Sequence, residues 1–170
     1  PNVPVIAPGL VRLIVPPLSV ALPPIVPAPV NVPSPSVAAP VDVPADVALD
    51  KPVHILYVTD AQAANASLHP RTLVVVDEGA RLRLVESFAS IGSATYFTNH
   101  VAEVGVGDGA RVDHYKVQRE SGSAFHVGTT QATQGRDSIY HSFSFATGAQ
   151  LSRTNVYSRL LGENAEVRLN

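Results

Sequence analysis

Six histidines are the side chains of this sequence best suited to metal or proton chemistry. Imidazole is a common ligand for zinc and iron, and it titrates close to neutral pH. No two of these histidines have the spacing of a zinc finger or of the helical HExxH motif, so spacing alone indicates no metal site. They are His54, His69, His100, His114, His126 and His141.

One of these histidines lies in an alternating apolar run. Ile139, His141, Phe143 and Phe145 occupy every second position, and alternate residues of a strand share one face. The alternation therefore predicts that His141 is a core or stacking histidine and not a metal ligand.

Acidic residues could supply the paired carboxylates of a polysaccharide-cleaving β-helix enzyme. Most of the candidates fall at turns, where an acidic side chain accepts hydrogen bonds from backbone amides, and this favours a structural role. A carbohydrate-active β-helix enzyme stays open as the alternative function. The candidates are Asp108, Asp113, Glu120, Asp137 and Glu163.

Other signatures of catalysis are weak or missing. Ser87, Ser121, Ser142 and Ser152 have no GxSxG context, and the glycine-rich segment 105–109 has no following lysine or helix to bind phosphate. The chain contains no cysteine, which excludes a thiol nucleophile and an all-thiolate cluster site within it. We therefore predict no catalytic, cofactor-binding or metal-binding residue in this chain.

Charge and composition exclude further classes of partner. The net charge is −2 and the arginines are spread along the chain, so no basic patch indicates nucleic acid. Prolines interrupt the apolar runs near the N-terminus, which argues against a signal peptide or a membrane helix. The sequence has no methionine, so we expect it to be a fragment of a longer protein.

The elements that must position these side chains fall into two unlike parts. Thirteen of the 15 prolines lie in residues 1–50, separated by valine, leucine and isoleucine. Proline prevents regular helix and removes backbone donors, so we expect residues 1–43 to form an extended or irregular arm against an apolar surface. Residues 44–170 are predicted to be one all-β domain, because its runs of β-branched and aromatic residues are short and end at turn formers. These runs are 53–58, 72–76, 81–85, 95–106, 111–118, 124–132, 138–146, 150–157 and 165–170.

A recurring turn favours one architecture. An acidic or polar residue is followed by glycine (or asparagine), alanine, a variable residue and an apolar residue, at 78–82, 108–112, 147–151 and 163–167. Glycine and asparagine tolerate the positive φ of a tight corner. We therefore predict a right-handed parallel β-helix with coils of irregular length, and a sandwich or jelly roll stays open as the alternative. In a β-helix, residues one coil apart stack, so His114 and His141 could be neighbours.

Several segments resemble one known family in its order. Residues 51–58 are similar to the segment that leads into the β-helix of the SufB/SufD iron–sulfur cluster assembly scaffolds, and most like that of SufD. Residues 69–80 are similar to the first full coil of that β-helix, and residues 84–88 continue it. Residues 140–145 and 162–170 are similar to later coils, so the resemblance covers residues 44–170. Residues 1–43 do not resemble the helical N-terminal region of that family.

The resemblance implies a role and a set of partners. It implies a cytoplasmic, non-enzymatic scaffold that pairs with a SufB-like homologous subunit and a SufC-like ABC-type ATPase, without nucleic acid or membrane. It implies no cofactor in this chain, although an iron–sulfur cluster could be held transiently in the whole complex. The coils with the interface cysteine and histidine are missing, so no functional residue of the family is transferred. A purely structural or adhesive β-solenoid stays open as a further alternative.

Overall fold

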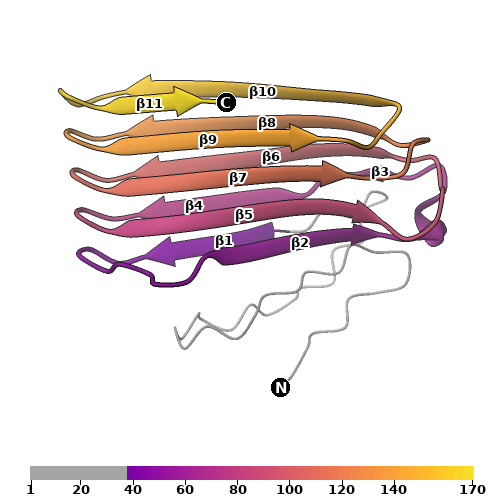
Figure 1. The fold of residues 1–170 in the computed structure, drawn as a ribbon, viewed down its shortest axis with the longest axis horizontal. Helices are drawn as coiled ribbons and strands as arrows, with labels where there is room; N and C mark the ends of the chain where they lie inside the picture. The colour runs from indigo at the N-terminus through magenta and orange to yellow at the C-terminus, as the bar shows by residue number, and fades with distance from the viewer. Residues whose placement is uncertain (1–37) are drawn as a thin grey trace, which may run out of the picture.

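The computed structural model describes residues 38–170 as a stack of parallel strands in two facing sheets (Figure 1). The chain passes from one sheet to the other and back, and each return adds one strand to each sheet. One sheet has the strand order β1-β4-β6-β8-β10, with the short β3 beside β6, and the other has the order β11-β9-β7-β5-β2. Every strand pair is parallel. The pairing confirms the predicted parallel β-helix and excludes an antiparallel sandwich or jelly roll.

The strand bounds follow the predicted β-rich runs closely. A single 3-10 turn, η1 (Ala61–Ala63), interrupts them, and none of the described residues forms a helix long and apolar enough to cross a membrane. The strands are β1 (Ala38–Val43), β2 (Val53–Thr59), β3 (Ser67–Leu68), β4 (Arg71–Val76), β5 (Arg81–Ser90), β6 (Phe97–Val106), β7 (Arg111–Arg119), β8 (Phe125–Gln134), β9 (Ile139–Ala146), β10 (Leu151–Leu160) and β11 (Glu166–Leu169).

The N-terminal boundary differs from the expectation. Residues 38–43, assigned above to the arm, form β1 and pair with β4, so these six residues are part of the solenoid. The proposed arm over residues 1–37 lies outside the described residues.

The core lies between the two sheets. Alternate residues of each strand point inward, and register pairing stacks them in columns, such as Ile55, Glu86 and Lys116 along β2, β5 and β7. In the first layers the inward residues are mostly apolar, for example Val53 and Ile55 of β2 and Leu82 and Leu84 of β5. In the middle layers the apolar columns give way to polar side chains.

One corner of the stack has a regular backbone conformation. Positive φ recurs at Asp46, Gly79, Gly109, Asp137 and Asn164, at spacings of 33, 30, 28 and 27 residues. The repeat is therefore more regular than the sequence indicated, because aspartate occupies this conformation in two layers. Aspartate and asparagine tolerate it at low cost.

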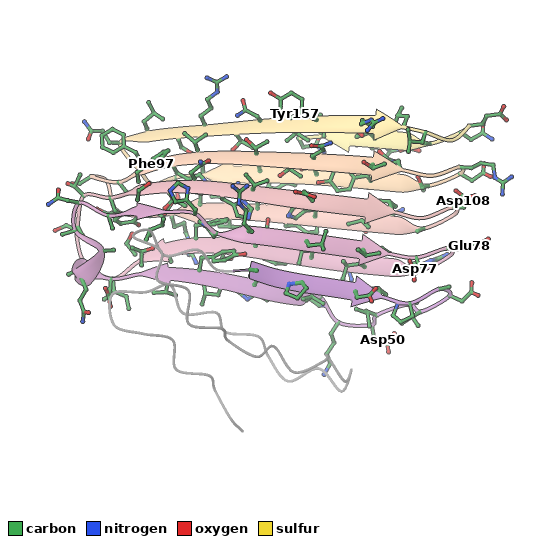
Figure 2. The ribbon with its side chains drawn as sticks, turned by 180° about the vertical axis from the view of Figure 1, so that it is seen from behind. Asp50, Asp77, Glu78, Phe97, Asp108 and Tyr157 are labelled. Atoms are coloured by element: carbon green, nitrogen blue, oxygen red, sulfur yellow. The ribbon has the colours of Figure 1, made fainter. Side chains whose placement is uncertain are left out.

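The turn at 147–151 does not belong to this corner. It joins β9 to β10 at the opposite edge, and its residue with positive φ is Ala149, not Gly148. The turn repeat read from the sequence looked irregular because it counted this turn together with those of the regular corner. Figure 2 shows Asp77, Glu78 and Asp108 along the edge with the regular corner, and Phe97 near the opposite edge.

The glycine-rich segment 105–109 is also explained by this corner. A Cβ on Gly107 would lie 2.7 Å from the backbone nitrogen of Glu78 in the layer below, which leaves no room for a side chain. Gly109, two residues later, adopts a φ of +64°. Close layer contact and turn geometry account for these glycines without a phosphate ligand.

Candidate functional site: the buried polar cluster

Polar and ionisable side chains occupy the interior of the middle layers. They project inward from both sheets and are almost completely excluded from solvent, with exposures of 6% or less. Because a buried charge is costly unless it is paired, a cluster of this kind indicates a specific arrangement. We call it the buried polar cluster, and its members are Thr72, Glu86, Thr98, His100, His114, Lys116, Gln118, Glu120 and His126.

Glu86 of β5 is the centre of the first half of the cluster. Its Oε1 accepts a hydrogen bond from Thr72 Oγ1 at 2.6 Å and lies 3.2 Å from His100 Nε2. Its Oε2 lies 2.9 Å from His114 Nε2. Both carboxylate oxygens are therefore bonded, and the charge is held by two imidazoles from opposite sheets.

Two buried tyrosines extend this half of the cluster along the stack. Tyr57 OH lies 2.8 Å from Thr72 Oγ1 in one direction. Tyr140 OH lies 3.0 Å from His114 Nδ1 in the other. Burial raises the pKa of both tyrosines, so both phenols stay protonated and can donate hydrogen bonds.

Lys116 adds a cation to the first half of the cluster. It is the register partner of Glu86 on the neighbouring strand β7, so residues of opposite charge occupy one column. Its Nζ lies 3.3 Å from His100 Nδ1 and 5.1 Å from the centroid of the Phe88 ring. The ammonium thus has an imidazole and an aromatic face beside it.

Glu120 is the centre of the second half. Its Oε2 lies 2.6 Å from His126 Nδ1 and accepts a hydrogen bond from Gln118 Nε2 at 3.0 Å. Its Oε1 accepts from Thr98 Oγ1 at 2.7 Å. Among the described residues, His126 Nε2 is a buried polar atom without a hydrogen-bond partner.

The surroundings shift the pKa values of the ionisable groups. Burial alone would raise the pKa of Glu86, but the charges and hydrogen bonds of His100 and His114 bring it well below its usual value. The pKa of Glu120 is lowered in the same way, because His126, Gln118 and Thr98 outweigh burial. Burial lowers the pKa of Lys116 and of His100, against the opposing effect of Glu86. The cluster therefore keeps its carboxylates ionised and disfavours added protons on these two bases.

The cluster has the chemistry of a charge-balanced hydrogen-bond network. Within residues 38–170 no group of three or more histidine, cysteine or acidic side chains has an arrangement that could hold a metal ion. The carboxylate oxygens are already used by hydroxyl, imidazole and amide donors. The network can fix side-chain positions and share protons between bonded groups.

The suggested pairing of His114 with His141 is wrong. The residue in register with His141 is Asp113, and His114 lies one position further, on the opposite face of the sheet. His114 points inward to Glu86, whereas His141 is partly exposed and lies 3.0 Å from Asp113 Oδ1. His141 was predicted to be a core or stacking histidine. It does not lie in the core, because the apolar alternation of β9 faces outward, with Phe143 and Phe145 exposed.

The other histidines singled out in the sequence have small, separate partners. His54 Nε2 lies 2.9 Å from Ser87 Oγ on the outer face of β2 and β5. His69 Nε2 lies 3.0 Å from Ser67 Oγ, beside the short strand β3.

The five candidate carboxylates do not come together in one groove. Glu120 is in the interior, and Asp113 forms an outer ion pair with Arg111 at 2.9 Å. Asp108 and Asp137 lie at the regular corner, where Arg136 pairs with each of them at 3.5 Å. Glu163 lies at the next layer of that corner, where its backbone oxygen accepts from Asp137 N.

The sequence interpretation missed Glu86 and Lys116, the charged pair at the centre of the cluster. A signal was present, because Leu82 and Leu84 are inward residues and continued alternation makes Glu86 inward as well. That Glu86 stacks on Lys116 follows only from the register between β5 and β7. This register is hard to read from the sequence, because successive coils differ in length.

Comparisons with known proteins point to one family. The sequence model described as SUF system FeS cluster assembly, SufBD core domain, matches residues 57–170. The iron–sulfur cluster assembly SufBD family protein slr0076 of Synechocystis is 36% identical over 120 residues, which cover 66% of this chain and 26% of the relative. The chloroplastic protein ABCI7 of Arabidopsis thaliana is 30% identical over 127 residues, which cover 71% of this chain and 27% of the relative.

A third relative is the iron–sulfur cluster assembly protein SufD of Escherichia coli. It is 28% identical over 122 residues, which cover 71% of this chain and 29% of that protein. The chain thus spans little more than a quarter of the length of the curated relatives that it matches. No solved structure matches the chain.

Proposed function

Because this chain belongs to the SufBD core family of the SUF iron–sulfur cluster assembly system, we propose that it is a scaffold subunit that pairs with a SufB-like homologous subunit and a SufC-like ABC-type ATPase. The family match confirms the resemblance found in residues 44–170. The specific partners, the absence of an activity of its own and a cytoplasmic location belong to the proposal.

The observation that supports a scaffold role is the family match. The SufBD core model covers residues 57–170, and these residues form most of the parallel solenoid. A β-solenoid offers long, regular strand faces on which a homologous β-helix can dock.

The chain's chemistry supports a scaffold more than a catalyst. It lacks cysteine, so the iron–sulfur cluster, as the cargo of the system, would take its thiolate ligands from residues outside this sequence. The buried polar cluster is closed to solvent and would serve to fix the middle layers. In this proposal ATP hydrolysis belongs to the SufC-like partner.

Affinity purification from the native cells tests the proposal. The tagged protein is recovered without cross-linking, and the proteins bound to it are identified by mass spectrometry, with an unrelated tagged β-solenoid as the control. We expect a SufB-like subunit and a SufC-like ATPase in the specific fraction. Recovery of the folded protein without either of them would refute the proposed pairing.

A further inference from the structure

We propose that the interior of the solenoid holds one water molecule between the side chains of Lys116 and His126, beside Gly128. In the buried interior, His126 Nε2 has no hydrogen-bond partner among the described residues. The water site lies inside the stack and does not depend on the proposed partners.

His126 supplies the open nitrogen. The residue is fully buried, and its Nδ1 lies 2.6 Å from Glu120 Oε2. Nδ1 therefore donates to the carboxylate, and Nε2 is left to find another partner. Among the described residues Nε2 has no partner, and a buried polar atom in this state costs about 1–3 kcal/mol.

Lys116 supplies the donor. Its ammonium has three N–H groups, and within the described part of the chain it donates to His100 Nδ1 at 3.3 Å. The Phe88 ring is close to the same nitrogen but accepts no conventional hydrogen bond. The ammonium can therefore donate to a further acceptor.

Gly128 brings the two nitrogens to one place. It is an inward-facing position of β8 and the register partner of His100. A Cβ built on it would overlap Lys116 Nζ and would lie 3.3 Å from His126 Nε2. Lys116 Nζ thus occupies the place of a side chain at Gly128, and His126 Nε2 lies on the same side of the strand.

The charges around this space select the ligand. Glu86 and Glu120 both lie in the cluster and disfavour an anion, and the ammonium disfavours a metal cation. The ligand must accept from an ammonium and also bond an imidazole nitrogen. Water meets both demands and is small enough for a closely packed core.

This water would join the two halves of the cluster. The hydrogen-bonded path would run from Glu86 through His100 and Lys116 to the water, and then through His126 to Glu120. One continuous network would then cross the interior between the two carboxylates.

A high-resolution crystal structure of the chain tests the site directly. We expect one ordered water within about 2.7–3.2 Å of both Lys116 Nζ and His126 Nε2. A direct contact between the two nitrogens, or an empty space between them, would overturn the proposal.

Two substitutions of buried residues separate the site from general effects on packing. Lys116→Met keeps the length of the side chain and removes the donor, so the water and its nuclear Overhauser contacts to His126 should be lost. Gln134→Met changes a fully buried polar residue of β8 that lies outside the cluster, and it should leave the water in place. If the Lys116 variant does not fold, the crystal structure of the unmodified chain decides the matter alone.

Discussion

At the scale of single residues, Glu86 is the charge on which the interior depends most. Three side chains bond its carboxylate, and two of them are imidazoles from opposite sheets. Removing one partner of a buried ion pair leaves the other charge buried and unpaired. The free-energy cost of that unpaired charge is larger than the net stabilisation that the intact pair provides.

Glu86→Gln is therefore expected to lower the free energy of unfolding by about 3–5 kcal/mol, because an amide cannot replace the charge facing His100 and His114. Glu103→Gln is the matched control, since Glu103 is exposed on the outer face of β6 and should change stability by less than about 0.5 kcal/mol. Urea unfolding followed by circular dichroism measures both. Equal effects of the two substitutions would show that the interior charge is not important for stability.

Stability should rise with pH across the acid range. The folded state lowers the pKa of Glu86 below its ordinary 4.5 and that of His100 below its ordinary 6.5. As pH falls through 6.5 and then 4.5, the unfolded chain binds these protons first, so the free energy of unfolding must decrease. The lowered pKa of Glu120 acts in the same direction.

Urea midpoints between pH 7 and pH 4 measure this dependence. Glu86→Gln should flatten the part of the curve below about pH 4.5, because the substituted residue no longer titrates. A midpoint that increases as the pH is lowered would contradict the described cluster.

At the scale of elements, the strands were predictable and the register was not. Period-two alternation and turn formers located the strands to within a few residues, for example β2 and β4. Alternation alone does not say which of its two faces is inside, and this is why His141 was placed wrongly. The register depends on coil length, and the corner at Asp137 was hidden because aspartate stands where other layers have glycine.

The corner conformation gives a prediction with a close control. A Cβ at Gly109 or at Gly122 would meet nothing within 4 Å, but only Gly109 has a positive φ, at +64°. Gly109→Ala should thus cost about 1–2 kcal/mol through backbone strain alone. Gly122→Ala should be close to neutral, and thermal unfolding of the two variants compares them. A Gly122 variant as unstable as the Gly109 variant would argue against strain at the corner.

At the scale of the whole molecule, the fold and the family were both accessible from sequence. The parallel solenoid followed from turn repeats, and the family followed from several segments in the right order. The buried polar cluster was not predicted, because its members are far apart in sequence and meet only through stacking of successive layers. Its chemistry is thus a property of the assembled stack and not of any local motif.

The central claim is that this chain is a scaffold subunit that pairs with a SufB-like homologous subunit and a SufC-like ATPase. It rests on membership of the SufBD core family, whose model matches residues 57–170.

Reconstitution from purified components tests this claim most directly. The chain is mixed with a SufB-like subunit and a SufC-like ATPase, and the mixture is analysed by size-exclusion chromatography with light scattering. We predict that the folded chain elutes with the SufB-like subunit and the SufC-like ATPase in one complex. A folded chain that elutes alone would contradict the proposed pairing.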